Sequence, residues 1–187
     1  MSDSYNILED AVRDIFVRTV WSHKIQEKQA DIYQKQYKCM ETINILCASL
    51  ASIGILSSIR HGELWIKIIS AVLSFATVFI GTYFKSFSPN KLARVHKETA
   101  NKLLIVRNEF TCLLTSIKLK NKSVEELEDR YRALMEKANE VYKDASTTTD
   151  KAVDLAKKGL QVKGDNTFSE EEIDSYLPAA LQKGNRK

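Results

Sequence analysis

The sequence predicts an all-α membrane protein, in which a two-helix transmembrane hairpin carries long cytoplasmic helices that extend it as a coiled coil or a bundle. Residues 42–59 form an uncharged run, and residues 64–84 form a second run whose one charge is Lys67. Each run approaches the roughly 20 residues that a helix needs to cross a hydrocarbon core about 30 Å thick. The lack of Gly and Pro across residues 6–39, where apolar residues recur at helical spacing, predicts the helical extension.

The composition fits one membrane unit with a soluble helical part. The chain has 187 residues, 28% of them charged, and a formal net charge of +4. Because no block of Lys and Arg with interleaved aromatic residues occurs, we expect no direct binding to nucleic acid. The polar start Met1–Ser4 predicts no secretory signal, so the chain is expected to insert through the hairpin itself.

Basic residues beside the two runs predict the orientation. The turn between the runs offers Arg60, with Lys67 just inside the second run. Many more basic residues precede the first run or follow the second: Lys24, Lys28, Lys35, Lys38, Lys85, Lys91, Arg94, Lys97 and Lys102. Since Lys and Arg are enriched on the cytoplasmic side, both termini are expected in the cytoplasm. Trp65 and Tyr83 are expected at headgroup level. The alternative, two buried helices in a soluble bundle, predicts release of the protein by carbonate extraction of membranes.

Four regions follow along the chain. Residues 1–41 are expected to form a cytoplasmic N-terminal helix that runs straight into the hairpin, residues 42–84. Residues 85–160 are expected to form a cytoplasmic helical region. Residues 161–187 are expected to form a linker and a short C-terminal helix with a disordered end.

Capping residues predict where the later helices begin. Ser88 is a favourable N-cap, and Pro89 after it is favoured at the first helical position. Two other Ser residues are followed three positions later by Glu, which is the spacing of a capping box. These pairs are Ser123 with Glu126, and Ser169 with Glu172.

One helix of the cytoplasmic region carries a heptad pattern. Its apolar residues follow spacings of 4-3-4-3-4: Leu127, Tyr131, Leu134, Ala138, Val141 and Ala145. Such a row forms either the seam between subunits of a coiled coil or the face that packs on neighbouring helices of the same chain. The pattern leaves both interpretations open.

Stripes of small and polar residues mark one face of each span. The stripe of the second span contains Ser70, Ser74, Thr77 and Gly81, and that of the first contains Cys47, Ala51, Gly54 and Ser58, with Asn44 as its strongly polar residue. Small residues let two membrane helices approach closely, so the stripes are interpreted first as packing faces. The sharper hypothesis is that they line a polar path. Two helices cannot enclose a pore, so that path requires an oligomer.

The sequence shows no catalytic constellation. There is no Gly-rich phosphate loop and no metal-ligand spacing, and Cys39, Cys47 and Cys112 are scattered. We therefore expect neither an enzyme nor a cofactor.

The order of these features resembles the SLATT domain family of bacterial two-transmembrane effectors. The resemblance covers roughly residues 5–160. It is carried by Trp21 and His23 before two close spans, by His96 with the Leu103-Leu104 pair after them, and by the junction Tyr37-Lys38-Cys39-Met40-Glu41-Thr42.

The resemblance implies an effector of an anti-phage defence system in the bacterial inner membrane. Such a protein is expected to oligomerise in the lipid bilayer and to permeabilise it after a cytoplasmic signal. The implied signalling partner is a nucleotidyltransferase or a reverse transcriptase encoded nearby. The alternative is a non-conducting membrane scaffold that recruits a partner through its cytoplasmic helices.

Overall fold

A computed structural model describes residues 2–165, 167–178 and 182. The described residues form helices and no strand, which confirms the all-α prediction. The elements are α1 Ser2–His61, α2 Leu64–Phe87, α3 Pro89–Leu119, α4 Val124–Lys143, α5 Asp150–Lys157, the π-helical turn η1 Lys158–Val162 and α6 Glu170–Tyr176. The end predicted to be disordered, 183–187, lies outside the described residues.

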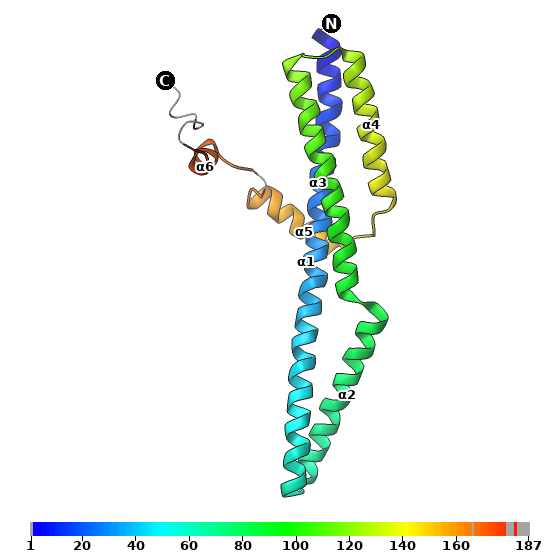
Figure 1. The fold of residues 1–187 in the computed structure, drawn as a ribbon, viewed down its shortest axis with the longest axis vertical. Helices are drawn as coiled ribbons and strands as arrows, with labels where there is room; N and C mark the ends of the chain where they lie inside the picture. Colours follow the sequence, from blue (N-terminus) through cyan, green and yellow to red (C-terminus); the bar gives the residue numbers. More distant parts are fainter. Residues whose placement is uncertain (1, 166, 179–181, 183–187) are drawn as a thin grey trace.

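Helix α1 is the spine of the molecule (Figure 1). Its 60 residues span about 90 Å at 1.5 Å per residue. The helix continues without a break through residues 41 and 42, where the apolar run begins. The N-terminal helix and the first apolar run are therefore one element.

Helix α2 returns along the lower half of α1, and α3 continues along its upper half (Figure 1). Gly62 makes the tight turn between α1 and α2 with a φ of +69°, a conformation that glycine adopts without strain. Helix α3 begins at Pro89, as predicted, but Ser88 is not its side-chain cap. Ser88 has a φ of 37°, and its Oγ donates backwards to the Phe84 carbonyl at 3.1 Å. An N-cap needs extended backbone to reach forward, so Ser88 instead closes α2.

The upper half of α1 packs with α3 and α4 in a three-helix bundle. The core contains Leu8, Val12, Val106, Phe110, Leu113, Ile117, Leu127, Leu134 and Ala138. Three members of the heptad row, Leu127, Leu134 and Ala138, are thus buried in this core. Tyr131 and Val141 pack against the core.

The heptad row therefore lies inside the protomer. Ala145, its last member, is half-buried just beyond the end of α4. Three of its six members are buried, so within this chain the row packs on neighbouring helices.

The caps agree with the sequence in part. Ser123 accepts a hydrogen bond from the Glu126 N–H, but the Glu126 carboxylate pairs with Lys122. Ser169 and Glu172 make both bonds of a capping box. After α4 the chain leaves the helix and α5 packs back on α1, with Ala152 and Ala156 fully buried.

Candidate functional site: the membrane hairpin and the polar layer above it

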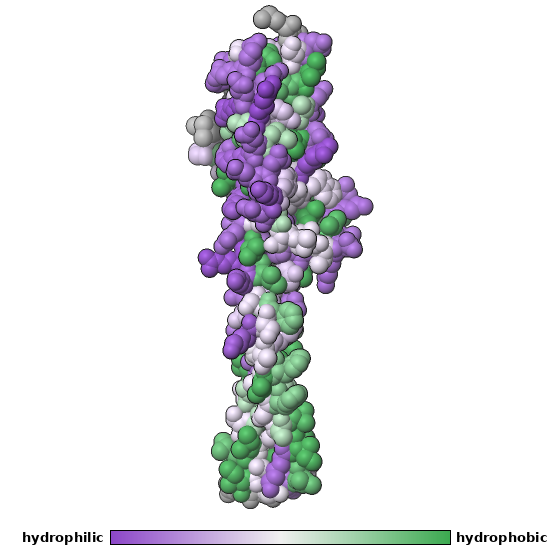
Figure 2. Space-filling view, turned by 90° about the vertical axis from the view of Figure 1, so that its right-hand side faces the viewer, coloured by the Kyte–Doolittle hydropathy of each residue, from purple (hydrophilic) through white to green (hydrophobic). Residues whose placement is uncertain are grey.

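The surface of the hairpin is inverted relative to a soluble protein. Large apolar side chains point outwards, with Leu56 69% and Phe75 72% exposed, whereas Ala51 is 4% and Ser70 3% exposed. Figure 2 shows the hydrophobic surface gathered over the lower part of the molecule, below a hydrophilic upper part. Two helices of the described chain are long and apolar enough to cross a membrane. An exposed apolar surface of this extent marks a membrane or protein interaction site, and each helix is long enough for a membrane span.

The small-residue stripes meet between α1 and α2. A Cβ added at Gly54 would lie 2.1 Å from Ser70 Oγ and 3.3 Å from Ser70 Cβ. The glycine therefore allows the closest approach of the two helices. Other members of the stripes are half-buried: Asn44, Cys47, Ser58, Ser74 and Thr77. Gly81 is exposed, and nothing lies within 4 Å of a Cβ built there, so it is outside the contact.

The hydroxyl groups of Ser58, Ser70 and Thr77 bond within their own helices. Ser70 Oγ donates to the Ile66 carbonyl at 2.8 Å, and Thr77 Oγ1 donates to the Leu73 carbonyl at 3.0 Å. Asn44 Oδ1 is buried and has no hydrogen-bond partner among the described residues. The contact is therefore made by packing, and its most polar atom is left unsatisfied.

Aromatic residues join the two helices at the wider end of the hairpin. The rings of Tyr37 and Phe84 lie 5.1 Å apart, and Gln36 Nε2 donates to Tyr83 OH at 3.3 Å. Tyr83 also packs on Phe87 at 4.9 Å. These contacts are next to the apolar runs, where amphipathic aromatic side chains fit the membrane interface.

A buried layer of polar side chains lies next to these aromatic contacts, on the side away from the apolar runs. Gln26 Nε2 donates to the Ser146 carbonyl at 3.2 Å, so Gln26 Oε1 faces Nδ1 of His96 at 2.6 Å and accepts a hydrogen bond from it. The His96 ring stacks on Tyr33 with centroids 5.5 Å apart. These side chains tie α1, α3 and the segment after α4 together.

Gln29 holds the start of α5 to α1. Its Oε1 accepts from both the backbone N–H and the Oγ1 of Thr149, each at 2.8 Å. Thr149 in turn caps α5 by accepting from the Ala152 N–H. The chain after α4 is thus attached to α1 through side-chain amides.

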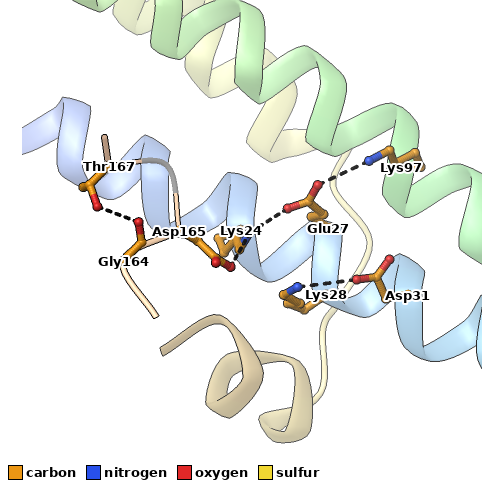
Figure 3. Close-up of polar contacts among 8 residues, drawn as sticks. All are labelled: Lys24, Glu27, Lys28, Asp31, Lys97, Gly164, Asp165 and Thr167. Atoms are coloured by element: carbon orange, nitrogen blue, oxygen red, sulfur yellow. Dashed lines mark hydrogen bonds and ion pairs between the residues drawn. The ribbon is translucent and has the colours of Figure 1, made fainter. Parts of the chain in front are cut away.

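Ion pairs complete the layer (Figure 3). Lys24 Nζ lies 3.0 Å from Glu27 and 3.0 Å from Asp165, which belongs to the segment after the π-turn. Lys97 of α3 reaches the other oxygen of Glu27 at 3.4 Å. One buried ammonium group therefore joins α1 to the C-terminal segment.

The pKa directions follow from this arrangement. Burial lowers the pKa of His96, and burial is also the largest cause of the lowered pKa of His23. Burial opposes the charge of Lys24, but the hydrogen bonds that it donates to Asp165 and Glu27 leave its pKa raised overall. Burial also opposes the charge of Glu27, but the Lys24 hydrogen bond leaves the pKa of that carboxyl lowered. The histidines are therefore neutral and the ion pair charged near neutral pH.

Sequence reasoning missed this layer because its side chains are polar. The spacing along the sequence could have revealed it, because the polar side chains lie on the same inward face of α1 as the buried apolar ones. The buried residues of this face are Leu8, Val12, Thr19, His23, Gln26 and Ala30. Within the described residues, no group of three or more His, Cys, Asp or Glu side chains is arranged to hold a metal ion.

No curated protein and no solved structure matches the chain. The sequence model of one family does match, over residues 8–172, and its description is SMODS and SLOG-associating 2TM effector domain family 4. The match covers most of the chain and includes both the hairpin and the polar layer. The two exposed apolar helices agree with the two transmembrane segments in that description. The chain therefore belongs to the SLATT family of two-transmembrane effectors linked to SMODS and SLOG systems.

Proposed function

We propose that this protein is a membrane effector of a bacterial anti-phage defence system that oligomerises and permeabilises the inner membrane when activated. The observation that carries the proposal is the hairpin, whose outer surface is apolar and whose polar stripe faces inwards. In a single hairpin this stripe is closed by helix packing at Gly54 and Ser70. The single closed hairpin is the resting form.

Activation would turn the stripe from a helix contact into a pore lining. The hydroxyls of Ser70 and Thr77 do not bond across the contact, and Asn44 Oδ1 has no partner among the described residues. Separating α1 from α2 would therefore break no interhelical bond of these groups. Several hairpins together would then supply the polar wall that two helices cannot enclose.

The orientation in this proposal has both termini in the cytoplasm. The polar layer and the three-helix bundle would then face the compartment in which a signal is made. A partner encoded nearby, a nucleotidyltransferase or a reverse transcriptase, would supply that signal. Labelling intact cells with a membrane-impermeant maleimide tests the orientation: Glu63→Cys in the turn should react, and exposed Cys112 on α3 should not.

Paired substitutions test the pore lining. Ser74→Leu with Thr77→Leu changes two half-buried stripe residues. The matched control, Ser52→Leu with Thr82→Leu, changes two exposed hydroxyls on the same two apolar helices. In the native operon, the stripe pair should abolish depolarisation and toxicity after phage infection, and the control pair should retain both.

A second stripe variant separates blocked conduction from poor packing. Ser74→Ala with Thr77→Val removes the hydroxyls and nearly keeps the shape. It should insert and assemble as the natural chain does, and still lower the efflux of dye from liposomes. Unchanged efflux in both stripe variants would contradict the proposal.

The alternative is a non-conducting scaffold that recruits a partner through its cytoplasmic helices. The ties between α1 and the segment after α4 favour it as a second candidate, because they give this helical part a defined shape. A scaffold predicts stable oligomers without dye efflux or ion current in liposomes.

A further inference from the structure

A cavity of about 670 Å³ lies between α1 and the C-terminal segment formed by α5 and the π-turn. We call it the lysine cavity, because five lysines line it: Lys28, Lys35, Lys151, Lys158 and Lys163. The first two come from α1 and the other three from the C-terminal segment. Two carboxylates, Asp31 and Asp165, also line the cavity, which leaves an excess of positive charge.

Both carboxylates are already paired with lysines, Asp165 with Lys24 and Asp31 with the cavity lysine Lys28. Asp165 bonds Lys24 at 3.0 Å and Asp31 lies 3.6 Å from Lys28 (Figure 3). Within the described chain, no ion pair is found for Lys35, Lys151 or Lys158. Like charges gathered around one space repel each other, and a bound anion removes that repulsion.

The C-terminal wall of the cavity is built by a specific backbone arrangement. The π-turn brings the Lys163 N–H to the Lys158 carbonyl at 3.1 Å, so two lysines five residues apart line one cavity. A Cβ on Gly159 would lie 2.7 Å from Asp165 Oδ2, so a larger residue there would displace the Asp165 carboxylate that pairs with Lys24. Single π-turns inside helices occur frequently at functional sites.

We propose that the lysine cavity binds a phosphorylated polyanion, held between α1 and the C-terminal segment. Lysine ammonium groups bind phosphate as point charges, and several of them suit a ligand with more than one phosphate. The cavity has the volume of a small-molecule site. Ile32 and Leu155 add an apolar part to the wall, where a non-phosphate portion of the ligand would rest.

The height of the lysine cavity above the membrane favours a soluble ligand over a lipid headgroup. Lys35 and Lys28 precede Thr42, the start of the apolar run, by seven and fourteen residues. At 1.5 Å per residue these positions are about 10 and 21 Å above the hydrocarbon. The headgroup layer is only about 5–8 Å thick on each side, so most of the cavity lies beyond it.

A bound polyanion would join the C-terminal segment more tightly to α1, the helix that continues into the membrane. That consequence for the hairpin rests on the proposed function, whereas the binding itself does not. A binding measurement therefore tests the cavity even if the hairpin never conducts.

The test compares two pairs of substitutions with the same loss of charge on the same elements. The cavity pair is Lys35→Gln with Lys158→Gln. The control pair is Lys38→Gln with Lys157→Gln, neighbouring exposed lysines that do not line the cavity. Full-length protein in nanodiscs of zwitterionic lipid is titrated with inorganic pyrophosphate by calorimetry. We expect the cavity pair to weaken binding about 10-fold or more and the control pair less than about 3-fold.

A second experiment tests whether the phosphate that binds in the lysine cavity belongs to a lipid headgroup. Nanodiscs containing phosphatidylglycerol are analysed by native mass spectrometry for retained lipid. Retention that is lost in the cavity pair but kept in the control pair, without pyrophosphate binding, would assign the phosphate to a headgroup. No binding in either arm, or equal weakening by both pairs, would overturn the proposal.

Discussion

The two halves of α1 have opposite surfaces although they form one unbroken helix. In residues 2–40 the buried positions include Val12 and the exposed positions are mostly charged or polar. In residues 42–59 the buried position is Ala51, and the large apolar side chains such as Leu56 are exposed. The backbone geometry is the same in both halves, so the surroundings account for the difference.

This contrast shows which force acts in each half. In water, burial of large apolar side chains stabilises the upper bundle. In lipid that driving force between helices is absent, and close packing of small residues takes its place. The polar layer at His96 and Gln26 lies between these two regimes, where side-chain hydrogen bonds join the elements.

Phenylalanine truncation gives the largest expected difference between the two regimes. Phe110→Ala removes a fully buried core side chain and should lower the free energy of unfolding of the bundle by about 3–5 kcal/mol. Phe75→Ala, the same change on the exposed apolar surface of α2, should lower it by less than about 1 kcal/mol. Denaturant titration in detergent, followed by helical circular dichroism, measures both. Equal losses would mean that Phe75 packs against protein.

Glycine substitution tests the packing of the hairpin. Gly54→Leu places a side chain where Ser70 lies and should destabilise the contact between α1 and α2 by about 1–3 kcal/mol. Gly81→Leu gains the same helix propensity but meets nothing within 4 Å, so it should be neutral or stabilising. Thermal unfolding in nanodiscs compares the two variants. A stable Gly54→Leu protein would show that the helices do not approach closely there.

Acidification tests the polar layer. The pKa of His96 is lowered by burial, so the unfolded chain binds the proton more readily than the folded one. The stability that depends on neutral His96 is therefore complete above about pH 6.5 and is lost as the pH falls from there towards its lowered folded-state pKa.

The matched variant is His96→Phe, which keeps a ring against Tyr33 but cannot titrate. Unfolding measured between about pH 7.5 and 5 should show a shallower loss of stability in this variant. The remaining slope should come from His23, whose pKa is also lowered, mainly by burial. An unchanged slope would mean that His96 is protonated in the folded bundle.

The smallest expected effect is at an exposed ion pair. Lys137 of α4 pairs with Glu109 of α3 at the surface of the bundle. Because both side chains are well exposed, Lys137→Ala should cost at most about 1 kcal/mol, and less at high salt. Denaturant titration at low and at 0.5 M salt checks this. A larger, salt-independent loss would show that packing by the Lys137 stem matters more than its charge.

Several elements were predictable because a local pattern specifies them. The uncharged runs predicted long apolar helices, which the structure has, and Pro89 placed the start of α3. The cap at Ser88 was mispredicted, since its left-handed backbone depends on how α2 and α3 join rather than on residue type. The stripes were identified as a face, but the sequence alone could not show that Gly54 meets Ser70 and that Gly81 meets nothing.

The sequence by itself determined the two apolar runs, the long helices and the absence of a recognisable catalytic motif, because periodicity and composition act over short stretches of chain. The tertiary structure decided the use of the heptad row, which is buried by α1 and α3 within one protomer. It also decided that α5 folds back on α1 and that five lysines from two distant segments line one cavity. Those outcomes depend on contacts between residues more than 100 positions apart, as between Gln26 and Ser146, which no local pattern encodes.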